Sequence, residues 1–139
     1  MKVRRTSPSN APRVMMDHLE RAFEADDFLV VNPFFSMSFR FSRETGQLRN
    51  PALVDPANFT RLTDRTKPQA LCSRLLAIIR QHPAKRFWFA TARKLDAPEA
   101  YGRVLAPLGR FEVVSRPPKH FLMRFRADPG AVRAASCGS

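Results

Sequence analysis

Apolar residues recur every three or four positions in three stretches of the chain, residues 12–25, 66–81 and 96–109. That spacing places them along one side of a helix, so each stretch is expected to form an amphipathic helix that packs against a sheet. A proline near the start of each stretch agrees with this interpretation, because proline is tolerated in the first helical turn.

Two other stretches alternate between apolar and polar side chains, with the apolar Leu122 as the exception in the second stretch. Residues 36–42 read SMSFRFS, and residues 120–126 read HFLMRFR. Alternation of this kind is typical of a half-buried strand with one face on the core and one face in solvent. In the first stretch, Arg40 would face outward together with three serines.

Two further strands are expected, at residues 86–91 and at residues 110–115. Residues 86–91, RFWFAT, are apolar on both alternating faces, which is typical of a central strand that is covered on both sides. Residues 110–115 and 120–126 are separated by a short segment with paired prolines, which predicts a hairpin with a loose turn.

Three stretches in the first half of the chain give weaker patterns. Residues 28–31 are apolar but are followed by Asn32-Pro33, and they are expected at a sheet edge or as a lead-in, because proline cannot donate to a ladder. Residues 48–54 are expected to form a short return strand, and residues 55–66 an irregular connection.

These elements predict an α/β (α+β) fold with two or three layers. A mixed sheet of about four or five strands would pack with two or three helices, in the order α-β-(β)-α-β-α-β-β. The chain of 139 residues suits one domain, residues 11–127, between a disordered basic tail at 1–10 and a flexible tail at 128–139.

The two cysteines, Cys72 and Cys137, lie far apart, and neither belongs to a CxxC or a Cys/His cluster. A zinc site is therefore not indicated, and Cys72 is expected to be a small buried hydrophobe. We expect a reducing intracellular compartment, cytoplasmic or nucleoid/nuclear, although the basic start MKVRRTSPSN is also compatible with organelle import. No apolar run approaches the roughly 20 residues that span a bilayer.

Charge points to the class of partner. The chain has 24 basic and 12 acidic residues, a net charge of +12, and 19 of the basic residues are arginine. Charge of this size favours a polyanionic partner, and arginine makes bidentate phosphate contacts and stacks on bases. A GC-rich genome, solubility or an acidic protein partner could also account for the excess.

The two alternating strands indicate where a nucleic acid would bind. If they lie in one sheet with their apolar faces inward, Arg40, His120, Arg124 and Arg126 share an outer face with Ser36, Ser38 and Ser42. The predicted nucleic-acid-binding residues are Arg40, Arg43, Arg49, Arg61, Arg65, Lys85, Arg93, Lys94, Arg116, Lys119, Arg124 and Arg126.

Catalytic motifs are not evident in this sequence. It contains no Walker-type loop, GxGxxG pattern, nucleophile elbow or HExxH pattern, and no cofactor or metal is indicated. The one weak catalytic candidate is His120, which could serve a metal-independent nuclease as acid or base beside Arg124.

The sequence therefore predicts a small, non-catalytic nucleic-acid-binding accessory protein, with RNA or a single strand preferred. A subunit of a ribonucleoprotein or a viral or mobile-element protein would fit. Two alternatives remain open: a protein-binding module or inhibitor that docks its basic face on an acidic partner, and a small metal-independent nuclease.

Overall fold

The computed structural model describes residues 11–62, 68–82, 86–92 and 98–137. Along the chain, the elements are α1 (Ala11–Ala22), β1 (Asp27–Val31), α2 (Pro33–Glu44), α3 (Pro51–Val54), the 3-10 turn η2 (Pro56–Asn58), β2 (Phe59–Arg61), α4 (Pro68–Gln81), β3 (Arg86–Ala92), α5 (Pro98–Leu105), the 3-10 turn η3 (Ala106–Leu108), β4 (Gly109–Ser115), β5 (His120–Ala127) and α6 (Pro129–Ala134). The predicted N-terminal tail, residues 1–10, lies outside the described residues.

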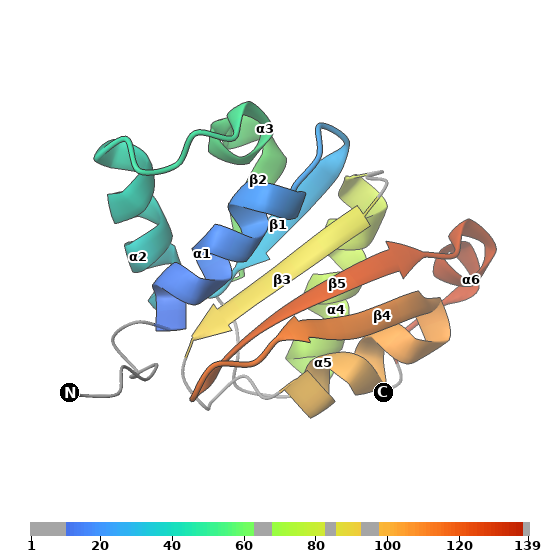
Figure 1. Cartoon of the computed structure of the whole chain (residues 1–139). Coiled ribbons are helices and arrows are strands. Elements are labelled where there is room, and N and C mark those ends of the chain that lie inside the picture. The colour runs from blue at the N-terminus through green and yellow to red at the C-terminus, as the bar shows by residue number, and fades with distance from the viewer. Residues whose placement is uncertain (1–10, 63–67, 83–85, 93–97, 138–139) are drawn as a thin grey trace.

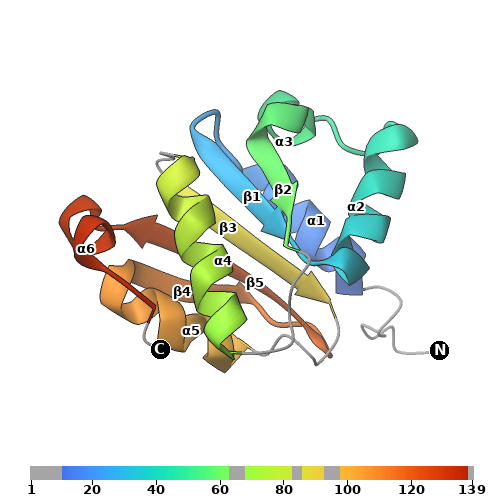
Figure 2. The same ribbon diagram turned by 180° about the vertical axis from the view of Figure 1, so that it is seen from behind.

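The strands form one mixed five-stranded sheet in the order β2-β1-β3-β5-β4. The first three strands are parallel, and β5 runs antiparallel to both β3 and β4. Helices α1, α2 and α3 cover one face of the sheet, and α4, α5 and α6 cover the other (Figures 1 and 2). The predicted mixed α/β architecture is confirmed, with six α-helices among the described residues where two or three were expected.

Strand β3 is the central strand that the sequence predicts. It lies between β1 and β5, and its residues from Phe87 onward are buried. Phe87 and Phe89 belong to the core beneath α4 and α5, whereas Trp88 and Ala90 belong to the core beneath α1 and α2. The apolar character of both alternating faces therefore reflects a helix layer on each side.

The expected strand at residues 36–42 is wrong, because these residues lie in the helix α2. Asn32 caps the helix, since its Oδ1 accepts a hydrogen bond from the Phe35 amide, and Pro33 occupies the first turn. The same Asn32 amide group also exchanges two hydrogen bonds with the backbone of Ala92 on β3. The buried side chains are Phe35, Phe39 and Ser42, which recur at helical spacing.

The surrounding segment also differs from the sequence prediction. β1 is not an edge strand, because it lies between β2 and β3 and is buried along its whole length. The expected return strand at residues 48–54 contains instead the short helix α3, which Asn50 caps. The expected irregular connection contributes the edge strand β2.

The C-terminal segment is packed against the domain and is not the flexible tail that was expected. Asp128 caps α6, and Val132 from this helix enters the core beneath α4. Cys137 forms a disulfide with Cys72 on α4, so the predicted free, buried Cys72 is wrong. The expectation of a reducing compartment relied on unpaired cysteines, and disulfides persist mainly in oxidising environments.

No helix in the described part of the chain is long and apolar enough to cross a membrane. The predicted β4–β5 hairpin and the helix α4 are present close to their expected positions. The hairpin carries three of the arginines described below, Arg110, Arg124 and Arg126, whereas α4 covers the opposite face of the sheet.

Candidate nucleic-acid interface

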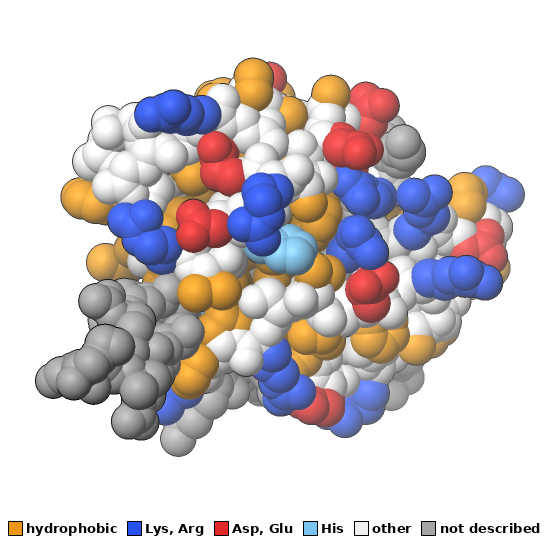
Figure 3. Space-filling model, in the orientation of Figure 1, with side chains coloured by type: hydrophobic (Ala, Val, Ile, Leu, Met, Phe, Trp, Pro, Cys, Tyr) orange, Lys and Arg blue, Asp and Glu red, His pale blue; other side chains and the backbone are white. Residues whose placement is uncertain are grey.

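Four arginines line a shallow hollow on the sheet face that carries α1, beside that helix. They are Arg86 on β3, Arg124 and Arg126 on β5, and Arg110 on β4, and the hollow has a volume of about 770 Å³. We call these four residues the arginine face. Figure 3 shows basic side chains close together over β5 and β4, with acidic side chains beside them.

The strand register explains why these arginines meet. Arg110 lies directly opposite Arg126 in the antiparallel pair of β4 and β5. Phe87 pairs with Phe125, so Arg86 occupies the position next to Arg126 on the other side of β5. The three arginines thus form a row across three strands, which lie about 4.8 Å apart in a sheet. Like charges directly opposite one another destabilise a sheet.

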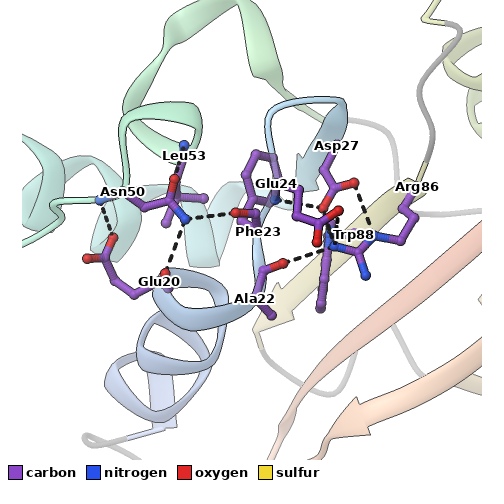
Figure 4. Close-up of polar contacts among 9 residues, drawn as sticks. All are labelled: Glu20, Ala22, Phe23, Glu24, Asp27, Asn50, Leu53, Arg86 and Trp88. Atoms are coloured by element: carbon purple, nitrogen blue, oxygen red, sulfur yellow. Dashed lines mark hydrogen bonds and ion pairs between the residues drawn. The ribbon is translucent and has the colours of Figure 1, made fainter.

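Arg86 anchors one end of this row through a buried carboxylate. Its Nε and Nη2 donate to the two oxygens of Asp27 at 3.1 and 2.7 Å, and Nη2 also donates to the Ala22 carbonyl. Asp27 further accepts from the Trp88 indole N–H and from the Glu24 amide (Figure 4). The hydrogen bond with Asp27 raises the pKa of Arg86 above its usual value. Arg86 is therefore a permanent and firmly positioned cation.

A second polar cluster fixes the helix that borders the site. The Asn50 side-chain amide donates to the carbonyls of Glu20 and Phe23 at the end of α1, and its Oδ1 accepts from the amides of Ala52 and Leu53. The Glu20 carboxylate in turn accepts from the Asn50 amide (Figure 4). These contacts connect the end of α1 to the start of α3.

Trp88 supports the guanidinium groups from below. Its side chain is fully buried, and the guanidinium carbons of Arg86 and Arg124 lie 5.3 and 5.7 Å from its ring centroid. Both distances are within the range of a cation–π contact. Arg124 also forms an ion pair with Glu112 on β4 at 2.7 Å.

Arg110 and Arg126 differ from these two residues. Both side chains are exposed, and neither forms an ion pair with any other residue in the described ranges. They are the two charges in the row that are available to an outside anion.

His18 on α1 lies at the border of this surface, with its ring centroid 6.1 Å from that of Trp88. Burial lowers the pKa of His18 below its usual value, and the charges of Arg21 and Arg124 lower it further. The lowered pKa favours the neutral imidazole. A polyanion bound nearby would offset the two arginines and favour the charged form.

Arg40 does not belong to this surface, which corrects the proposed pairing of residues 36–42 with residues 120–126. It lies on α2, forms an ion pair with Glu44 at 3.5 Å, and α1 lies between α2 and β5 (Figure 1). Ser36, Ser38 and Ser42 are likewise on α2, so the hydroxyl-and-guanidinium strand surface does not exist.

The other predicted binding residues are spread over several parts of the molecule. Arg43 contacts the Phe59 ring, Arg49 follows α2, Arg61 ends β2, and Arg116 and Lys119 lie in the hairpin turn. Arg116 is close to Glu99 at 3.5 Å. Arg65, Lys85, Arg93 and Lys94 lie outside the described residues.

His120 is not beside Arg124. The two residues share a face of β5 but are four positions apart, which is about 13 Å along a strand, and the buried Leu122 lies between them. The His120 Nδ1 is 2.8 Å from the Pro118 carbonyl oxygen. Arg124 is therefore not placed to assist His120 in the way that the nuclease hypothesis supposed.

Sequence reasoning found Arg124 and Arg126 but missed Arg86, Arg110 and the bordering His18. Arg110 could have been found by extending the predicted hairpin, because residues on paired strands share a face at alternate positions. Arg86 required knowledge of which strand lies next to β5.

Among the described residues, no group of three or more histidine, cysteine, aspartate or glutamate side chains is placed to hold a metal ion. No family model, curated protein or solved structure matches the chain.

Proposed function

We propose that this chain is a nucleic-acid-binding accessory protein that contacts the phosphate backbone through the arginine face. The observation that carries the proposal is the directly opposed pair of Arg110 and Arg126, which are exposed and form no ion pair with the other described residues. Such a pair costs stability in the free protein, and a phosphate group placed between two guanidinium groups removes that cost.

The fixed residues around the pair support the same function. Arg86 and Arg124 are held by Asp27, Glu112 and the buried Trp88, so two of the four guanidinium groups of the arginine face are fixed without a ligand. Preorganised cations lose little side-chain entropy when they bind an anion. The net charge of +12 would also raise the rate of encounter with a polyanion.

Which nucleic acid the chain prefers can be tested by comparing RNA, single-stranded DNA and duplex DNA. Because Trp88 is fully buried, bases could stack on the guanidinium planes of the arginine face but not on this tryptophan. The preference for RNA or a single strand therefore stays a prediction, which depends on stacking between arginine and unpaired bases.

The test compares the variant Arg110→Ser/Arg126→Ser with the control Arg13→Ser/Arg103→Ser, which removes two exposed arginines from α1 and α5. Binding to labelled single-stranded RNA, single-stranded DNA and duplex DNA would be measured by fluorescence anisotropy at several salt concentrations. The arginine-face variant should lower the slope of log affinity against log salt by about 1.5, since each lost phosphate contact removes roughly 0.7–0.9. The control variant should change the slope by less than half as much as the arginine-face variant does.

Two results would contradict the proposal. One is the absence of salt-dependent binding at about 50 mM salt, where electrostatic binding is strong. The other is an equal loss of slope in both double variants, which would mean that net charge alone matters. Capture of an acidic protein that survives nuclease treatment and depends on Arg110 and Arg126 would favour the alternative of a protein-docking module.

A further inference from the structure

The strand β4 forms one edge of the sheet, and its outer side is open. Its only strand partner in the described chain is β5, and its residues make no backbone hydrogen bonds to other described elements. Arg110, Phe111, Glu112 and Val113 are all exposed, with Phe111 at 38% and Val113 at 40%. An open edge of this kind is a template for pairing with another strand.

This edge carries few of the features that usually prevent association. It contains no proline and no lysine, and its bulge lies at the far end, between Val113 and Ser115. The first five residues, from Gly109 to Val113, pair regularly with β5. They offer an extended segment with two apolar side chains on the face toward α5.

The charges on the other face of β4 are self-complementary. If two β4 strands pair antiparallel with Phe111 at the centre, Arg110 of each copy lies directly opposite Glu112 of the other copy. A centre at Arg110 or Glu112 would instead place like charges opposite one another, which is unfavourable. Charge thus selects one occupant for the edge, a second copy, and one register.

We propose that two copies of this chain associate through their β4 edges, antiparallel and centred on Phe111, to form a continuous ten-stranded sheet. The two-fold axis is perpendicular to the sheet, as expected for an isologous interface. Both arginine faces then lie on the same side of the dimer and adjoin across the axis. The pairing does not depend on the proposed function. In the dimer, Arg110 lies opposite Glu112 of the other copy, so Arg126 is the member of the opposed pair that keeps no acidic partner among the described residues.

The first test places a charge on the edge. Val113→Lys should raise the dimer dissociation constant at least tenfold, because an edge lysine opposes strand addition. The matched control is Met37→Lys on α2, where the methionine is 74% exposed and lines a hollow between α1 and α2. Sedimentation equilibrium in 150 mM salt over about 5–200 µM protein would measure the constants. A wild-type chain that stays monomeric throughout would overturn the proposal, as would a dimer that Met37→Lys disrupts and Val113→Lys does not.

The second test addresses the register. Arg110→Glu and Glu112→Arg should each weaken the dimer, and the double exchange Arg110→Glu/Glu112→Arg should restore it, since opposite charges again face one another. Circular dichroism melts would confirm that each variant folds. A double variant that is no stronger than either single variant would contradict the register.

Cysteine cross-linking gives an independent measure of the same register. Phe111→Cys should form an intermolecular disulfide in the presence of oxidised glutathione, because residue 111 lies opposite itself at a Cα distance of about 4.5–5.5 Å. Val113→Cys is the control, since two copies of residue 113 would lie about 13 Å apart along the strands. Cross-linking of the control but not of Phe111→Cys would exclude this pairing.

Discussion

At the scale of single residues, the most constrained group is Asp27. Its side chain is fully buried, and it accepts hydrogen bonds from two nitrogens of Arg86, from the Trp88 indole and from the Glu24 amide. Removing a carboxylate from water is costly, and these four donors and the charge of Arg86 offset the cost. Asp27 thereby determines the position of Arg86, and through it one end of the arginine face.

Asp27→Asn tests this role. The amide keeps the shape of the side chain but removes the buried counter-charge of Arg86, so the free energy of unfolding should fall by about 3 kcal/mol. Urea denaturation at pH 7 would measure it. The control is Glu24→Gln, because Glu24 is exposed and lies 3.5 Å from the same guanidinium; its cost should stay below about 1 kcal/mol. Equal losses in the two variants would show that the buried pair has no special importance.

At the scale of secondary structure, the apolar residues of α2 fit both the two-residue period of a strand and the period of a helix. Met37, Phe39 and Phe41 alternate with polar residues as in a strand, but Phe35, Phe39 and Ser42 recur as in a helix, and the second set is buried. The deciding contacts are the Asn32 cap and its hydrogen bonds to Ala92, a residue 60 positions away. Local alternation contains no information about that contact.

Substitutions on α2 distinguish the two arrangements. In a strand, Met37 and Phe39 would face the same way and matter equally. In the helix, Phe39→Ala should lower the free energy of unfolding by about 3–4 kcal/mol, because a large buried side chain leaves a cavity. Met37→Ala should cost less than about 0.5 kcal/mol, as is usual at an exposed position. Thermal or urea unfolding of both variants would measure the difference, and similar costs would contradict the helix.

The elements that could be predicted are those whose pattern depends on local burial alone. β3 is apolar on both faces because both helix layers cover it, and α4 has a wide apolar face because it lies on the sheet. β2 has only three residues and depends on β1 for its pairing, so its own sequence says little. The candidate site divides in the same way. Arg124 and Arg126 share a face by the two-residue period of one strand, whereas Arg86 and Arg110 join them only through strand order.

At the scale of the whole molecule, the proposed anion-binding surface and the cross-linked C-terminal segment lie on opposite faces of the sheet. The arginine face lies on the side of α1, and the Cys72–Cys137 disulfide joins α4 to the segment after α6 on the other side of the sheet. Arg80 on α4 reinforces that link, because its Nη2 donates to the carbonyls of Val132 and Ala135. The stability of the C-terminal segment should therefore be separable from anion binding.

The double variant Cys72→Ser/Cys137→Ser tests this separation. The disulfide connects residues 65 positions apart, and by loop-closure entropy a cross-link of that span stabilises the folded state by up to about 4 kcal/mol, with 2–4 kcal/mol typical. The urea midpoint of the wild type should fall by a corresponding amount when dithiothreitol is added, whereas the variant should show no response to the reductant.

Under conditions where both proteins remain folded, their affinities for single-stranded RNA should agree within about twofold. A wild-type urea midpoint that does not change when the reductant is added would contradict the stabilising role of the disulfide. A large loss of affinity in the folded variant would show instead that the two faces of the sheet are coupled.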